Sequence, residues 1–328
     1  MGRPDDVTTP EVTPRIVGMR DAFFEELLKI FRLDPNCVFV AADNGAPTLD
    51  TFARELPRQY VTVGIAEQEA VGLAAGMALE GWRPWVYAIA PFVTARVYEF
   101  AKLDICAMSL PVTLLGVGAG YSYDIMGPTH HTTEDLALMR SLPGMTVWSP
   151  ADGRTAGALA KHVYRARTPA YIRFDRAGLP DLGGEVNLES GYRLHRPGPG
   201  PGCRCIVTTG VMTHLALQAF GGTDTVVEVL RLPISREVAS LVNGFPEVVT
   251  LEEHLLPGGL GAAVLEALSD LGDWPTPAVL RLGADGYVFD LGGREEIWRR
   301  LGLGVADIKR RVTEWSQDEP GRPDERPL

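Results

Sequence analysis

The chain has 328 residues, 45% of them hydrophobic, which is enough to bury the cores of two domains. Its formal net charge of -11 argues against a nucleic-acid footprint, and arginine supplies most of the positive charge available for anionic ligands. No apolar run is long enough to span a membrane and the chain start carries no apolar secretion signal, so we expect a cytoplasmic protein without membrane contact.

The first half of the chain alternates strand and helix patterns. A polar start at 1–14, expected to be flexible, precedes a helical pattern at 16–31 and an apolar run typical of a buried strand at 37–42. Further strands are predicted near 60–63, 85–90, 112–117, 145–148 and 170–174, and further helices near 66–80, 93–108, 132–141 and 152–166. This order predicts an α/β domain over 15–180 built on a doubly wound, mostly parallel sheet.

The second half repeats the alternation after a break. Residues 181–204 include a Pro-Gly repeat at 196–202 that fits neither a helix nor a strand interior, so we interpret this segment as a linker. Strands near 205–209, 225–230, 247–251 and 278–282, with helices near 211–220, 234–242, 259–271 and 293–301, predict a smaller α/β domain over 205–316. The charged, Pro-rich tail at 317–328 is expected to be flexible.

A binding site is expected at the carboxyl ends of the strands, where doubly wound sheets hold their ligands. Glu67 follows one such strand and begins a helical pattern, in which it shares a stripe with Val71, Ala74 and Ala78. A carboxylate buried there without a cationic partner has a raised pKa and can share a proton with a ligand. The alternative is that Glu67 only complements the helix dipole.

Two adjacent histidines, His130 and His131, lie in a long loop at 116–135, and such loops tend to be functional. They project differently and no third ligand is in view, which argues against a metal site. Two alternatives stay open: a histidine that hydrogen-bonds a substrate, or a polar cap for the helix that starts near Thr132. The cysteines also lack zinc-ligand spacing and are predicted to be buried free thiols: Cys37, Cys106, Cys203 and Cys205.

Aromatic and basic side chains follow other strands. Phe92, with Arg96 and Tyr98 just after it, offers a wall for a flat ring, although core packing is the ordinary explanation for one aromatic residue there. Arg20 and Arg176 fit an anionic ligand, and the alternative for each is a surface arginine.

Several motifs in this order resemble the pyrimidine-binding and C-terminal domains of the transketolase family. They are Val63-Gly-Ile-Ala-Glu-Gln68, Pro91-Phe92, Gly127-Pro-Thr-His130, Glu134-Asp-Leu136, Arg140-Ser-Leu-Pro143, Ser149-Pro-Ala-Asp152, Leu251-Glu-Glu-His254 and Pro257-Gly-Gly-Leu-Gly261. The chain is most similar to the C-terminal-section subunit of a split, two-chain transketolase. Its cousins are 1-deoxyxylulose-5-phosphate synthase and the β subunits of 2-oxoacid dehydrogenase E1.

The resemblance implies a thiamine-diphosphate enzyme that transfers a two-carbon ketol unit from a phosphorylated ketose to an acceptor. Glu67 matches the glutamate that activates the cofactor's aminopyrimidine, and Phe92 matches the aromatic that stacks on it. His130 matches a histidine that contacts the donor sugar, in a catalytic role. Further cofactor contacts are expected from Asp43, Arg96 and Tyr98, and substrate contacts from Arg20, Arg176, His130, His131, Tyr121 and Asp124.

Two departures from the family pattern touch the donor sugar. Transketolases usually have an aspartate before Gly-Pro-Thr-His, where this chain has Met126, and another histidine earlier in the loop, where it has Gly118. Tyr121, Ser122 and Asp124 are the candidates to replace them. An unusual donor or acceptor is therefore expected.

The family motif that holds the diphosphate through a divalent metal, Gly-Asp-Gly followed by Asn-Asn, is absent from this sequence. The resemblance therefore implies an N-terminal-section partner that carries the diphosphate and Mg²⁺, in an α2β2 heterotetramer. Gly72 and Gly76 leave a bare helix face that fits a close helix contact at such an interface, or tight internal packing. Two alternative functions remain: an E1β-like subunit that transfers an acyl group, and a non-catalytic regulatory subunit of the same fold.

Overall fold

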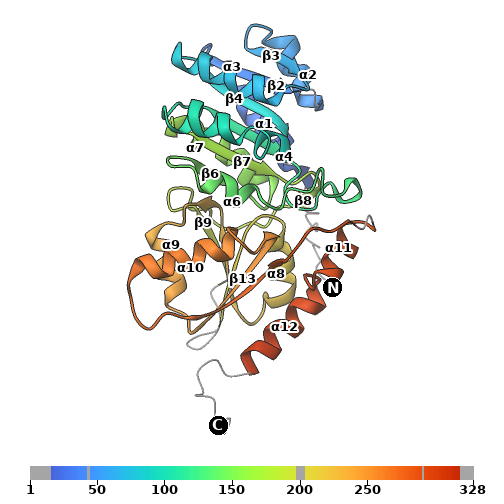
Figure 1. Ribbon diagram of the computed structural model, residues 1–328, viewed down its shortest axis with the longest axis vertical. Helices are drawn as coiled ribbons and strands as arrows, with labels where there is room; N and C mark the ends of the chain where they lie inside the picture. Colours follow the sequence, from blue (N-terminus) through green and yellow to red (C-terminus); the bar gives the residue numbers. More distant parts are fainter. Residues whose placement is uncertain (1–15, 43–44, 197–203, 290–291, 318–328) are drawn as a thin grey trace, which may run out of the picture.

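The computed structural model describes residues 16–42, 45–196, 204–289 and 292–317, which form two α/β domains stacked along the long axis of the molecule (Figure 1). Each domain is built on its own largely parallel sheet. The predicted α/β class is therefore confirmed. The expected flexible start at 1–14 and the Pro-Gly stretch at 197–203 lie outside the described residues. Of the tail expected to be flexible at 317–328, Gln317 ends the last helix and the rest lies outside the described residues.

The first sheet has seven strands in the order β12-β6-β7-β5-β4-β2-β3. They are β2 (Cys37–Ala42), β3 (Tyr60–Gly64), β4 (Arg83–Ile89), β5 (Thr113–Val117), β6 (Thr146–Trp148), β7 (Ala170–Phe174) and β12 (Arg231–Leu232). All neighbouring strands run parallel except β12, which pairs antiparallel with β6. The central strands are buried almost throughout, as expected when helices cover both faces of a parallel sheet.

Helices cover both faces of this sheet. One core lies beneath α1 (Met19–Phe31), α2 (Pro47–Glu55) and α7 (Gly153–Ala166). The other lies beneath α3 (Glu67–Leu79), η1 (Ala101–Cys106) and α6 (Asp135–Arg140). The single helix predicted at 93–108 is instead broken into α4 (Ala90–Val93), α5 (Tyr98–Phe100) and η1. The break follows Thr94, whose hydroxyl donates to the Ala90 carbonyl and so competes with the helical hydrogen bonds.

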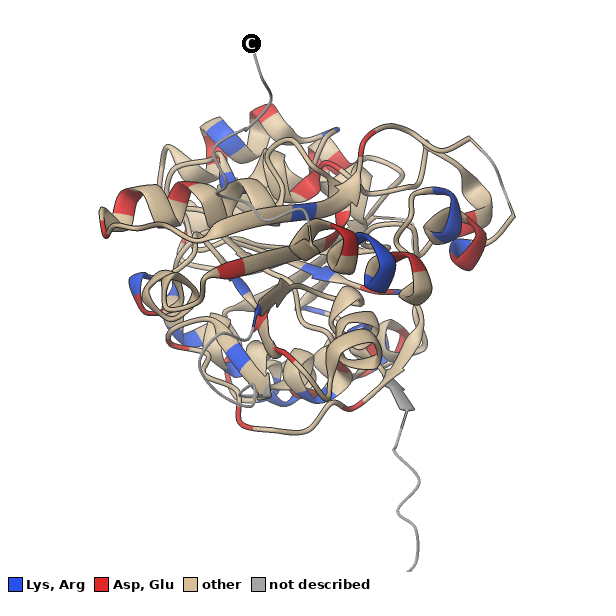
Figure 2. Ribbon diagram, turned by 90° about the horizontal axis from the view of Figure 1, so that it is seen from below, with Lys and Arg blue, Asp and Glu red and all other residues tan. Residues whose placement is uncertain are grey.

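The second sheet has the order β14-β13-β10-β11-β9. Its strands are β9 (Tyr192–Arg196), β10 (Cys205–Thr208), β11 (Thr225–Val229), β13 (Glu247–Leu255) and β14 (Ala278–Ala284), and its helices are α8 (Met212–Phe220), α9 (Arg236–Asn243), α10 (Leu260–Leu271), α11 (Arg294–Arg300) and α12 (Val305–Gln317). Basic and acidic residues are interspersed along the helices seen in Figure 2.

Part of the segment interpreted as a linker is structured. Residues 192–196 form β9, an edge strand antiparallel to β11. Just before the segment, at the end of the predicted first domain, β8 (Gly178–Pro180) pairs with β1 (Ile16–Gly18). The sequence did not predict β9, because two of its buried side chains, Arg193 and His195, are polar and so break the apolar pattern of a strand. Both bind the buried carboxylate of Glu228 on β11.

The two domains share a buried ionic junction at this strand. Arg193 lies within 2.8 Å of Asp152 at the start of α7 and within 2.7 Å of Glu228, and all three side chains are fully buried. Asp152 also accepts the Thr155 N–H as the N-cap of α7. Removing one member would leave an uncompensated buried charge, which typically costs about 3–5 kcal/mol. This junction fixes the first domain against the second.

Candidate active site

The parallel strands β2, β3, β4, β5 and β7 end at the same edge of the first sheet. Glu67 follows β3, Phe92 follows β4, the loop with His130 follows β5, and Arg176 follows β7. The predicted convergence of these segments is thus present in the fold. Asp43, at the end of β2, lies outside the described residues.

Glu67 is the first residue of α3 and is 4% exposed. Val71, Ala74 and Ala78 share its buried stripe, as the helical spacing predicted. Glu67 has a cationic partner in this structure, because Arg96 Nη1 donates to Glu67 Oε2 at 2.7 Å. The sequence could not show this pair, since the broken helix between α4 and η1 turns Arg96 toward α3.

Arg96 also stacks on Phe92. Its guanidinium carbon lies 4.1 Å from the centre of the Phe92 ring, so one planar cation touches both the carboxylate and the aromatic face. The Arg96 side chain is 41% exposed, which leaves it a path toward solvent. Phe92 is therefore part of a polar cluster and not only of the core.

His130 also contacts Phe92. The two rings meet edge to face, with 5.3 Å between their centres, and His130 Nδ1 lies 2.9 Å from the Thr129 hydroxyl. Burial lowers the pKa of His130, and the neighbouring His131 and Arg96 lower it further. The imidazole is consequently neutral at neutral pH, when it can donate or accept a hydrogen bond.

Three of the expected substrate residues hold their loop to the second domain. Tyr121 is 1% exposed and packs against Ala284 and Ile297, and the ring of His131 lies edge to face on it. Asp124 accepts the Arg294 N–H at the start of α11. These contacts account for Tyr121, His131 and Asp124, and we assign them no ligand.

Tyr123 is a site residue that the sequence analysis missed. A Cβ atom on Gly118 would lie 2.3 Å from the Tyr123 ring, so the ring occupies the space that a side chain at position 118 would need. Gly118 also has a φ of +103°, which side chains disfavour. The sequence did contain a signal for this arrangement. Position 118 is a glycine where the family pattern has a histidine, and a tyrosine follows five residues later.

Tyr123 links His130 to the two candidate arginines. Its ring centre lies 5.9 Å from that of His130, and the guanidinium carbon of Arg176 lies 5.1 Å from it. Burial raises the pKa of Tyr123, and the charges of Arg176 and Arg20 act against that rise. Arg20 also donates to the hydroxyl of Tyr87 at 3.5 Å. The structure therefore places Arg176 against the Tyr123 ring, and Arg20 near enough for its charge to act on the same tyrosine.

Comparison with known proteins identifies the fold. Residues 16–181 match the family described as "Transketolase, pyrimidine binding domain". The chain belongs to the transketolase family. It is 33% identical over 314 residues to one of the subunits of an apulose-4-phosphate transketolase from Phocaeicola vulgatus, covering 92% of this chain and 98% of that one. It is also 34% identical to 1-deoxy-D-xylulose-5-phosphate synthase 2 of Geobacter sulfurreducens, but spans only 48% of that longer protein.

Solved structures of the transketolase family show the same arrangement. A split-gene transketolase described as an inactive β4 tetramer is 32% identical, with a TM-score of 0.77, and the match covers 92% of this chain and 98% of the other. The transketolase of Pichia stipitis, at 20% identity and a TM-score of 0.75, supports the fold alone, and this chain covers 46% of it. Like these split subunits, the present chain is a transketolase-type subunit.

Other features of this transketolase-family chain lie away from the strand ends. Tyr98, expected beside the cofactor, has its hydroxyl 2.9 Å from Ser141 at the end of α6. No cluster of metal-binding side chains occurs within the described ranges, and no helix there is long and apolar enough to cross a membrane. Cys37 and Cys106 are buried free thiols, as predicted, Cys205 is buried, and Cys203 lies outside the described residues.

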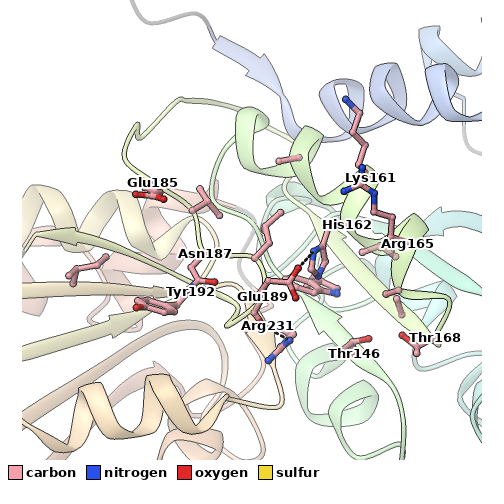
Figure 3. Close-up of a pocket in the computed structure, with 18 residues that line it drawn as sticks. Thr146, Lys161, His162, Arg165, Thr168, Glu185, Asn187, Glu189, Tyr192 and Arg231 are labelled. Atoms are coloured by element: carbon pink, nitrogen blue, oxygen red, sulfur yellow. Dashed lines mark hydrogen bonds and ion pairs between the residues drawn. The ribbon is translucent and has the colours of Figure 1, made fainter.

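A large cavity of about 1060 Å³ opens at the opposite edge of the sheet, by the amino ends of β6 and β7. Figure 3 shows His162 facing Glu189, with Arg231 beside them. Two of its basic side chains have partners: Lys161 pairs with Glu26, and Arg231 donates to the Glu189 carbonyl. The cavity contains none of the residues of the candidate site.

Proposed function

We propose that this chain is the pyrimidine-side subunit of a thiamine-diphosphate enzyme that transfers a two-carbon ketol unit from a phosphorylated ketose. The observation that carries the proposal is the buried Glu67 carboxylate at the head of α3, beside the face of Phe92. The match to a protein named as a transketolase subunit along nearly its whole length supports the reaction class.

The pair of Glu67 and Phe92 fits an aminopyrimidine. Such a ring is flat and carries nitrogen atoms that hydrogen-bond a carboxylate, and the guanidinium of Arg96 is likewise a flat nitrogen group. Arg96 makes both contacts at once, at 2.7 Å to Glu67 and 4.1 Å above Phe92. We infer that Arg96 stands in for the aminopyrimidine in the cofactor-free chain and swings toward solvent when the cofactor binds.

Glu67 then acts as the proton-sharing group. The cofactor supplies the stabilised carbanion chemistry that a ketol transfer needs. Once Arg96 leaves, the buried Glu67 carboxyl is free to hydrogen-bond a ring nitrogen and to share a proton with it. His130, neutral and in contact with Phe92, is placed to hydrogen-bond a donor-sugar hydroxyl or carbonyl.

The other end of the proposed site binds the phosphate. Arg176 lies against the Tyr123 ring and the charge of Arg20 acts on the same tyrosine, and guanidinium groups bind phosphate oxygens through two parallel hydrogen bonds. The Tyr123 ring occupies the space of the side chain that transketolases carry at position 118, and it lies between His130 and Arg176 in the chain of ring contacts. This difference supports a donor or acceptor unlike the common pentose phosphates.

The proposed partner is the N-terminal-section subunit, carrying Mg²⁺ and the diphosphate, in an α2β2 assembly. Gly72 and Gly76 on α3 have no atom within 4 Å of the space a Cβ would fill, so this face is open and not tightly packed within the chain. Exposed apolar residues lie in or next to α3 and η1, which contact each other: Ile65, Leu79, Leu103 and Met108. An open small-residue helix with an apolar border fits a close helix contact with another chain.

Reconstitution tests the proposed function. The chain is co-expressed with a subunit carrying the Gly-Asp-Gly and Asn-Asn motif, and ketol transfer from xylulose 5-phosphate, fructose 6-phosphate and other ketose phosphates is measured with thiamine diphosphate and Mg²⁺. We expect transfer by the pair and by neither chain alone. A stable, cofactor-loaded pair that transfers an acyl group from a 2-oxoacid, and no ketol unit from any ketose, would contradict the proposal.

A further inference from the structure

Arg294, the first residue of α11, lies between the two domains. Its Nη2 atom is 2.6 Å from Asp175 at the end of β7 in the first domain and 2.6 Å from Glu253 on β13 in the second. Its Nε atom donates to Glu253 at 2.8 Å. Although burial opposes the charge, the attraction of Glu253 and Asp175 raises the pKa of Arg294. One guanidinium therefore joins the two domains through two carboxylates.

The same helix start holds the loop that carries Tyr123. The backbone N–H of Arg294 donates to Asp124 Oδ2 at 3.1 Å. Glu253, fixed by Arg294 and by the indole N–H of Trp298 at 2.6 Å, packs so closely on the loop that a Cβ at Gly120 would lie 1.9 Å from its carboxylate. Arg294 thus contacts the loop at 116–135 in two ways: directly, through Asp124, and indirectly, through Glu253, which packs against Gly120.

Each first-domain partner of Arg294 adjoins a residue of the proposed phosphate end. Asp124 follows Tyr123, and Asp175 precedes Arg176. Tyr123 and Arg176 contact each other: the guanidinium carbon of Arg176 lies 5.1 Å from the centre of the Tyr123 ring. The position of Tyr123 relative to Arg176 is therefore set by contacts that converge on a single residue of the second domain.

We propose that Arg294 is a positioning residue, through which the C-terminal domain holds Tyr123 and Arg176 in register for a phosphorylated substrate. This inference rests on the proposed function for its substrate, but its structural part does not. A purely stabilising role is the competing explanation. It predicts loosening of the whole domain interface, whereas positioning predicts changes confined to the two loops and to phosphate recognition.

Hydrogen exchange on the purified chain tests the structural part without any activity. In Arg294→Gln we expect faster exchange in the segments 118–126 and 174–177, and unchanged exchange in α7 and β9 at the other end of the interface. The matched control is Arg140→Gln, which breaks another interdomain ion pair, with Glu266 at 2.7 Å, and should leave both loops unchanged. If the glutamine variant does not fold, Arg294→Lys replaces it in the same measurement. Lysine keeps the positive charge but cannot make the paired hydrogen bonds of the guanidinium group.

A double-mutant cycle in the active complex tests the link to phosphate. We expect Arg294→Gln to raise the KM of a phosphorylated donor about three- to thirtyfold with a smaller change in kcat, the range of such couplings. In an Arg176→Ala background the same change should have little further effect, because both act on one contact. Loops that exchange as in the wild type, or fully additive effects on KM, would overturn the proposal. An Arg176→Ala variant that treats phosphorylated and unphosphorylated donors alike would instead refute the phosphate assignment itself.

Discussion

Arg96 Nη1 donates to Glu67 Oε2 at 2.7 Å while its guanidinium covers the face of Phe92. This pair neutralises the buried carboxylate and occupies the aromatic face on which a cofactor ring would stack. In this arrangement the Arg96 side chain covers the proposed pyrimidine position. In our account Arg96 must be displaced before Glu67 can exchange a proton with a ligand.

Replacing Arg96 is expected to strengthen cofactor binding. Arg96→Ala removes a competing charge-assisted contact worth roughly 1.5–3 kcal/mol, so the affinity of the assembled complex for thiamine diphosphate should rise about tenfold or more. Isothermal titration calorimetry measures this directly, with the exposed Arg54→Ala as the control. Weaker binding by Arg96→Ala would show that Arg96 contacts the bound cofactor and does not compete with it.

Glu67→Gln is expected to lower turnover by about a hundredfold or more, the contribution typical of a general acid–base group. The amide keeps the size of the side chain but cannot hold the proton, so assembly should be intact. Steady-state rates of the purified complex provide the measurement, and Glu69→Gln, an exposed carboxylate in the same helical turn, is the matched control. Equal rates for Glu67→Gln and the wild type would mean that Glu67 only complements the helix dipole.

Arg176→Ala is expected to weaken phosphorylated donors selectively. Charge-assisted contacts of roughly 1.5–3 kcal/mol correspond to about a ten- to hundredfold loss in kcat/KM. The same assay with an unphosphorylated ketose should show little change, and the exposed Arg310→Ala on α12 is the control. The selectivity ratio of the two donors is the deciding quantity, and an unchanged ratio would remove Arg176 from the phosphate end.

Gly76→Leu is expected to weaken assembly. The open face of α3 would receive a bulky side chain, and overpacking a close contact costs about 1–3 kcal/mol. Size-exclusion chromatography with light scattering on the co-expressed pair reports the mass, and Arg310→Leu controls for added surface hydrophobicity. If the Gly76→Leu complex keeps both mass and activity, the α3 face lies away from any interface.

The sequence predicted what depends on local pattern. The burial of Glu67 followed from its spacing to Val71 and Ala74, and the convergence of strand ends followed from the alternation of strands and helices. The ion pair with Arg96 did not follow, because it joins residues 29 apart across a helix that the sequence predicted to be continuous. Tyr123 was missed because its role depends on the loop conformation that places its ring over Gly118.

Some motifs that carried the family resemblance turn out to build the domain junction. Asp152 caps α7 and binds the buried Arg193, and Arg140 pairs with Glu266 across the interface. His254 accepts the Ala137 N–H from the first domain at 3.4 Å. A sequence comparison cannot separate such structural positions from catalytic ones, because it registers only that the residue types are identical.

The most direct test of the central claim is calorimetric titration of thiamine diphosphate with Mg²⁺ into three samples: this chain alone, the diphosphate-side partner alone, and the assembled pair. A subunit that holds only the pyrimidine half of the site should bind the cofactor appreciably only as part of the pair, and Glu67→Gln should weaken that binding. Micromolar, metal-dependent binding by the isolated chain would contradict the account of a split site.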